Sequence, residues 1–163
     1  MSKAAYLEWY KAGSHAVRSA CEQGVAAAGK AEQHFADADA KALAADGKAM
    51  LGRHQEAFVG FLTDIGEQPN DFVDQIMKGI GEGVALSLKA AEEPEIVDVA
   101  LLTGEQTGLH YFIAAYGAHG TAATALGMPA HAEQLRQMTE ECQTLDRRYA
   151  EVATASVSPA AAA

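Results

Sequence analysis

The amino-acid sequence predicts an all-α protein with several long helices. Alanine and charged residues are abundant, only four prolines occur in 163 residues, and no alternating run of Val, Ile and Thr is long enough for a strand. The segment from Pro94 to Met128 carries apolar residues at steps of three, four or seven, the spacing of one helical face. A chain of this length buries about 70% of its unfolded surface, so we expect one domain, residues 1–155, followed by a flexible tail, residues 156–163.

The first helix is expected from about Lys3 to Lys30. Tyr10, Val17 and Cys21 fall on its apolar face, whereas His15 falls on the opposite side and should be solvated. Residues 29–39 are weakly patterned and should break the helix.

The second helix should begin near Asp37 or Asp39, because either side chain can cap it. It should end at about Ile65, since a glycine and then a proline follow. Its apolar stripe contains a single ionisable residue, His54. This histidine is therefore the first candidate for a polar role inside the protein.

Residues 70–93 carry enough apolar side chains for one or two short helices, which we expect to be interrupted at the glycines in positions 79, 81 and 83. The central helix starts with a proline and an acidic residue at positions 94 and 95, both typical of a first turn. It should stop at Gly127, and a last helix is expected from Pro129 to about Ala155. The chain thus predicts four long helices, with the short helical segment between the second and the third.

The composition excludes some classes of partner. The formal net charge of −10 and the lack of clustered Lys and Arg argue against binding to nucleic acid or to an anionic membrane. No apolar run is long enough to span a membrane, and the first residues lack the pattern of a secretory signal, so we expect a cytoplasmic protein. In that compartment Cys21 and Cys142 should be free, buried thiols.

Several short motifs occur in the same order in one bacterial protein family. They are IGEQP at residues 65–69, EEPEIVDVAL at 92–101 followed by Gln106, HY at 110–111 and IAAYG at 113–117, with Asp146 near the end of the chain. Through these motifs, over about residues 5–152, the chain resembles the YciE/YciF family of ferritin-like, stress-associated bacterial proteins.

The resemblance implies a ferritin-like four-helix bundle, often a dimer, with a dinuclear iron or manganese site at its centre. Such a site needs a Glu from each of two helices and a Glu-x-x-His from each of the other two, because two divalent cations require several anionic oxygens. In this chain the corresponding inward positions are empty, apolar or a thiol: Gly13, Leu51, Leu109 and Cys142. We therefore expect a degenerate metal site and no cofactor.

The residues that could still hold a metal are His54, Glu105, His110 and Glu141. His54 lies on an apolar stripe, where a neutral, hydrogen-bonded core histidine is the simpler interpretation. His110 should lie beside the core face and bond to a neighbouring helix. Glu105 straddles the inner face but is expected to be solvated, as mid-helix glutamates usually are. Glu140 and Glu141 are expected to be surface charges, with Glu141 better placed than Glu140 to face inward.

Three functions remain open from the sequence. The first is a non-catalytic structural or interaction protein, a homodimer or higher homo-oligomer, that acts in stress physiology. The second is an enzyme, an oxidase or peroxide-consuming protein that uses iron or manganese in an atypical site formed by the four candidate ligands. The third is a module that binds a small apolar ligand in a core pocket around Gly13, Leu51, Leu109 and Cys142. The lost carboxylates favour the first, so an enzyme is the less expected outcome.

Overall fold

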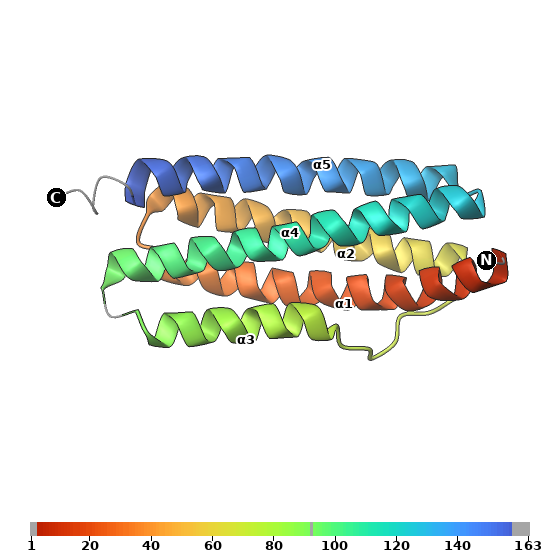
Figure 1. Ribbon diagram of the computed structural model, residues 1–163, viewed down its shortest axis with the longest axis horizontal. Helices are drawn as coiled ribbons and strands as arrows, with labels where there is room; N and C mark the ends of the chain where they lie inside the picture. The colour runs from red at the N-terminus through yellow and green to blue at the C-terminus, as the bar shows by residue number, and fades with distance from the viewer. Residues whose placement is uncertain (1–2, 92, 158–163) are drawn as a thin grey trace.

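The computed structural model, which describes residues 3–91 and 93–157, contains four long helices side by side in an elongated bundle (Figure 1). They are α1 (Lys3–His34), α2 (Ala38–Asp64), α4 (Pro94–Leu126) and α5 (Pro129–Val152). One additional helix, α3 (Gln75–Lys89), packs outside the bundle against α1 and α4, and a π-helical turn, η1 (Ala153–Val157), follows α5. The described residues form no strand, so the predicted all-α bundle is confirmed.

The helix ends follow local sequence signals. The Asp37 carboxylate caps α2 by accepting hydrogen bonds from the amides of Asp39 and Ala40. Gly66 after α2 and Gly127 after α4 both have φ of 78°, the left-handed conformation in which a chain commonly leaves a helix. The boundaries expected for α2 and α4 are confirmed.

The break expected within residues 29–39 lies at residues 35–37, so α1 continues one turn past Lys30, where Ala31 is still buried. One expectation about helix continuity is wrong. α3 is one helix without an interruption at its glycines. One of its faces packs on the bundle, and this burial offsets the conformational cost of glycine. That face consists of Met77, Ile80, Val84 and Leu88.

The linker between α2 and α3, residues 66–74, runs along α1 and covers a face that the sequence analysis placed in solvent (Figure 1). The Arg18 guanidinium on α1 donates to the backbone carbonyl of Asn70 in this linker. His15 lies close to Glu67 of the same linker and is only 8% exposed, so the expectation of a solvated His15 is wrong. Periodicity identified the side of α1 that faces the bundle, but it carries no information about a linker that covers the other side.

The core lies between the inner faces predicted for the long helices. On α1 and α5 those faces are confirmed by the buried side chains Tyr10, Val17, Cys21, Leu135, Met138, Cys142, Leu145 and Tyr149. No helix among the described residues is long and apolar enough to cross a membrane. The predicted tail starts within η1, and its last residues, 158–163, lie outside the described residues, so the domain boundary at residue 155 stays a prediction.

The close packing of α3 on α4 depends on Gly104. A Cβ atom at this position would lie 2.5 Å from Val84 Cγ2, whereas a Cβ atom at Gly117 of the same helix would meet no atom within 4 Å. We expect Gly104→Ala to be less stable than Gly117→Ala by on the order of 1–3 kcal/mol, because both gain helix propensity but only the first pushes α3 away. Chemical denaturation measures the difference, and equal stabilities would contradict this close contact.

Candidate functional site

The centre of the bundle contains a chain of four hydrogen-bonded side chains. His54 on α2 lies between Tyr116 on α4 and Glu141 on α5: its Nδ1 is 3.1 Å from Tyr116 Oη, and its Nε2 is 3.3 Å from Glu141 Oε2. The same Tyr116 oxygen is 3.4 Å from Sγ of Cys21 on α1. Each of the four long helices therefore contributes one residue to this central chain.

Burial fixes the protonation of the central chain. It lowers the pKa of His54 to about 4, against the opposing effect of Glu141, and it raises the pKa of Cys21 to about 12. At neutral pH the imidazole is therefore neutral and the thiol is protonated. Every member is satisfied when Cys21 Sγ–H donates to Tyr116, Tyr116 O–H donates to His54 Nδ1, and His54 Nε2–H donates to the Glu141 carboxylate.

Glu141 carries the negative charge of the central chain, and Arg53 neutralises it. The Arg53 guanidinium donates to Glu141 Oε2 at 2.7 Å, and both side chains reach the surface between α2 and α5. Glu140 and Glu141 are both exposed, as expected for surface charges, but only the Glu141 carboxylate reaches inward to His54. This carboxylate already accepts hydrogen bonds from both His54 and Arg53.

The four inward positions that lack a ligand side chain are filled. A Cβ atom on Gly13 would overlap Nε2 of His119, so the imidazole from α4 occupies this space. Burial lowers the pKa of His119, whose Nδ1–H donates to the carbonyl oxygen of Ala115 at 2.9 Å. At the remaining three positions the side chains are almost fully buried and pack the core: Leu51, Leu109 and Cys142.

His110 lies at the surface, away from the bundle centre, with 68% of its side chain exposed. Its Nε2 is 3.1 Å from Asp146 Oδ2 on α5, and the Gln106 amide donates to the other oxygen of the same carboxylate at 3.0 Å. His110 thus bonds to a neighbouring helix, as expected. This bond connects α4 with α5 outside the core.

Glu105 is only partly exposed and turns toward the interior of the bundle, so the expectation of a fully solvated side chain is wrong. It shares the inner stripe of α4 with Leu102 and Leu109, and it lines a cavity of about 570 Å³ between α1, α3 and α4. Burial raises the pKa of Glu105 to about 7, although the neighbouring Tyr149 hydroxyl lowers it. Tyr149 is fully buried, and its hydroxyl has no partner in normal hydrogen-bond geometry.

These residues do not fit a dinuclear metal centre. Both nitrogens of His54 are engaged, Glu141 is paired with Arg53, and Glu105 and His110 lie elsewhere. Among the residues that the structure describes, no three His, Cys, Asp or Glu side chains gather where they could hold a metal ion. One carboxylate at the centre does not supply the anionic oxygens that two divalent cations require.

A second histidine network, which the sequence analysis missed, connects α1, α2 and α5 away from the central chain. The Tyr10 hydroxyl is 3.0 Å from His131 Nδ1, and His131 Nε2 is 3.0 Å from Asp64 Oδ2. The three residues are far apart in sequence, so no local spacing links them. Only the packing of the helices brings them together.

This architecture defines a class of protein: a four-helix bundle with one additional helix, whose centre holds hydrogen-bonded side chains from all four long helices. Within that class, the chain belongs to the family described as a domain of unknown function, DUF892, whose profile matches residues 8–162. A search of curated protein sequences gave no significant match.

Two solved structures share this fold. YcfI of Rhodopseudomonas palustris, for which a structural role has been suggested, superposes with a TM-score of 0.84 at 17% sequence identity, over 88% of this chain and 92% of that chain. The E. coli stress protein YciF superposes with a TM-score of 0.69 at 22% identity, over 91% of this chain and 94% of that chain. Together with the family match, these similarities confirm the YciF-like family that the motifs predicted.

The buried carboxyl of Glu105 should make the native protein less stable as the pH rises. Its native pKa of about 7 exceeds the ordinary value of 4.5, so the native state holds this proton more tightly than the unfolded state, and the free energy of unfolding falls from about pH 4.5 to 7. Glu105→Gln cannot ionise at this position. Its free energy of unfolding should be higher than that of the original protein by on the order of 1–3 kcal/mol at about pH 8, and the two values should be equal near pH 4.

Denaturation curves across this pH range measure the effect of Glu105→Gln. Glu82→Gln is the matched control, because it removes an exposed carboxylate that lines the rim of the same cavity. The control should follow the pH profile of the original protein. A Glu105→Gln profile parallel to that of the control would show that Glu105 is not desolvated.

Proposed function

We propose that this chain is a non-catalytic, ferritin-like bundle protein with a degenerate metal site, which acts in the cytoplasm as a structural or interaction oligomer in stress physiology. The observation that supports the proposal most strongly is the central chain of Cys21, Tyr116, His54 and Glu141. The nitrogen and oxygen atoms that a metal ion would need as ligands there already form hydrogen bonds with other side chains of the same chain. The description of YciF as a stress protein supports the physiological setting.

The state of the thiols also favours a non-catalytic role. A cysteine acts as a nucleophile through its thiolate, and burial raises the pKa of both Cys21 and Cys142 far above neutrality. Both thiols are fully buried in the bundle. They therefore act as small apolar side chains, with Cys21 also a hydrogen-bond partner of Tyr116.

Metal analysis of purified protein tests the absence of a metal centre. Protein produced with iron and manganese supplied should contain well below about one metal ion per chain, and a chelator should leave its Tm unchanged, because a metal bound only to the native state would stabilise it. One or two ions per chain would instead support the oxidase or peroxide-consuming alternative. In that case His54→Gln should abolish metal binding, whereas His110→Gln, outside the centre, should retain it.

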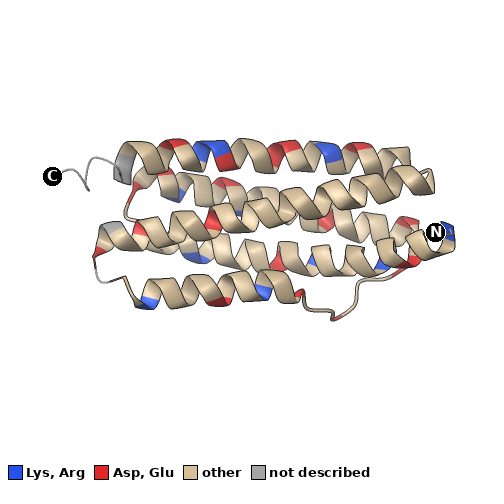
Figure 2. Ribbon diagram, in the orientation of Figure 1, with Lys and Arg blue, Asp and Glu red and all other residues tan. Residues whose placement is uncertain are grey.

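The exposed face of α4 supports an oligomer. From Gln106 to Ala132 the sequence contains no Asp, Glu, Lys or Arg, and Figure 2 shows this part of α4 without charged side chains, in contrast with α5. Exposed helix faces normally carry charges, whereas the core of a protein interface is depleted in them. The exposed residues in this segment are mostly small, including Ala114, Gly117, Ala118, Thr121 and Ala125. We infer that this face joins two copies of the chain.

A single charge on this face should separate the two copies. We expect Ala118→Arg to convert a homodimer into a monomer, because two desolvated guanidinium groups would meet near the middle of the interface. Gln143→Arg, at an exposed position on α5, adds the same charge and should leave the dimer intact. Light scattering after size-exclusion chromatography gives the masses, and a monomeric original protein or a dimeric Ala118→Arg would contradict this interface.

A further inference from the structure

The cavity between α1, α3 and α4 has no role in the function proposed above. Its volume of about 570 Å³ lies within the range of small-molecule sites, roughly 300–1,000 Å³. It begins beneath α3 and reaches Leu145 on α5, so it penetrates the bundle. It includes Leu51 and Leu109 of the pocket expected from the sequence, but not Gly13, which the His119 ring covers.

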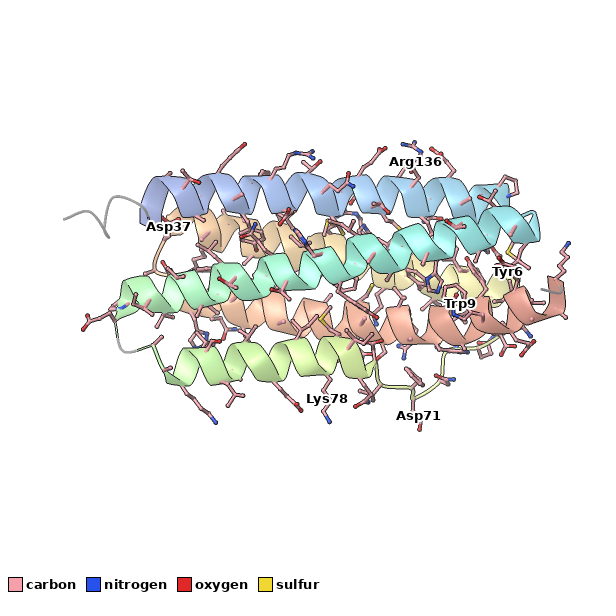
Figure 3. The ribbon with its side chains drawn as sticks, viewed as in Figure 1. Tyr6, Trp9, Asp37, Asp71, Lys78 and Arg136 are labelled. Carbon is pink, nitrogen blue, oxygen red and sulfur yellow. The ribbon has the colours of Figure 1, made fainter. Side chains whose placement is uncertain are left out.

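Among the described residues that line the cavity, Glu105 is the one ionisable side chain that is only partly exposed. Four other ionisable side chains line the cavity, and all are exposed at its rim: Lys30 and His34 on α1, and Lys78 and Glu82 on α3. Figure 3 shows Lys78 pointing away from the bundle. α2 contributes only Gly47 and Leu51 to the lining, and α5 places Leu145 in the lining and the Tyr149 hydroxyl next to Glu105.

A buried carboxylate without a counter-charge is costly, and no described residue forms an ion pair with Glu105. A metal ion is a poor partner, because no other metal-ligating side chains gather there. An anionic ligand would be repelled, and a purely apolar one would leave the carboxylate unpaired. An ammonium group attached to an apolar body suits both the charge of Glu105 and the apolar walls.

We propose that this cavity binds an amphipathic amine, whose apolar body packs against the cavity walls and whose ammonium group donates hydrogen bonds to the Glu105 carboxylate. The site requires neither a metal ion nor a second copy of the chain, so it is independent of the function proposed above.

The ionisation of Glu105 agrees with this occupant. Because burial raises its pKa to about 7, the carboxylate is only partly formed at neutral pH, and a bound ammonium group would favour the ionised form. Binding of a cation should therefore be weaker in mild acid. His34 lies at the rim of the same cavity, so a variant that lacks only the Glu105 carboxylate isolates the contribution of Glu105.

Isothermal titration calorimetry of the full chain with n-octylamine, n-octanol and sodium octanoate tests the proposal, because these probes share an eight-carbon chain and differ in the head group. At about pH 8 we expect octylamine to bind roughly tenfold or more tightly than octanol, the factor for one charge-assisted hydrogen bond, and octanoate to bind more weakly than both. The affinity for octylamine should fall roughly tenfold by pH 6, following the ionised fraction of Glu105.

Three variants test whether the Glu105 carboxylate is the group that selects the amine. Glu105→Gln should bind octylamine and octanol about equally and lose the pH dependence, whereas Glu105→Asp should keep the preference for the amine. Glu82→Gln changes the net charge by the same amount at the exposed rim and should leave the preference unchanged. Equal binding of amine and alcohol by the original protein, or an equal loss of preference in Glu105→Gln and Glu82→Gln, would overturn the proposal.

Discussion

The constraint at the centre of this bundle is that each side chain of the central hydrogen-bonded chain needs a partner. Cys21, Tyr116, His54 and Glu141 meet that requirement together, with hydrogen bonds running in one direction from the thiol to the carboxylate. Since each long helix supplies one member, a shift of any helix by one turn would leave a buried donor or acceptor unpaired, at a cost of roughly 1–3 kcal/mol. Apolar burial holds the helices together, whereas these hydrogen bonds favour one alignment among them.

Two carboxyl groups that reach toward the interior meet this requirement differently. Glu141 ends the central chain near the surface, where Arg53 reaches it and balances its charge. Among the described residues none forms an ion pair with Glu105, and the group beside it is the uncharged hydroxyl of Tyr149. The Glu141 carboxylate therefore already has its partners within the bundle, whereas the Glu105 carboxylate remains available to a ligand. Function is better sought at an unbalanced buried charge than at a balanced one.

Sequence periodicity predicted most of the fold, because the inner faces and caps of long helices are local properties. The spacing also places Glu105 on the inner stripe, three residues after Leu102 and four before Leu109. Glutamates in the middle of a helix are usually exposed, however, and this general preference led to the expectation of a solvated side chain. Other features had no local signal. The overlap of His119 with the Cβ position of Gly13, and the contact of His54 with Glu141, join residues from different helices, and they follow only from how those helices pack.

Two of the titratable groups with shifted pKa values, His54 and Glu105, oppose each other in their effect on stability. His54, with a native pKa lowered to about 4, stabilises the fold above its unfolded value of 6.5, and this stability is lost as the pH falls toward 4. Glu105 acts in the reverse sense over a similar interval, because its raised pKa removes stability as the pH rises. The opposing slopes flatten the stability of the free protein across mild acid. A cation bound at Glu105 would offset the loss on the alkaline side, so that the liganded bundle is weakened mainly by protonation of the buried histidines His54 and His119 in acid.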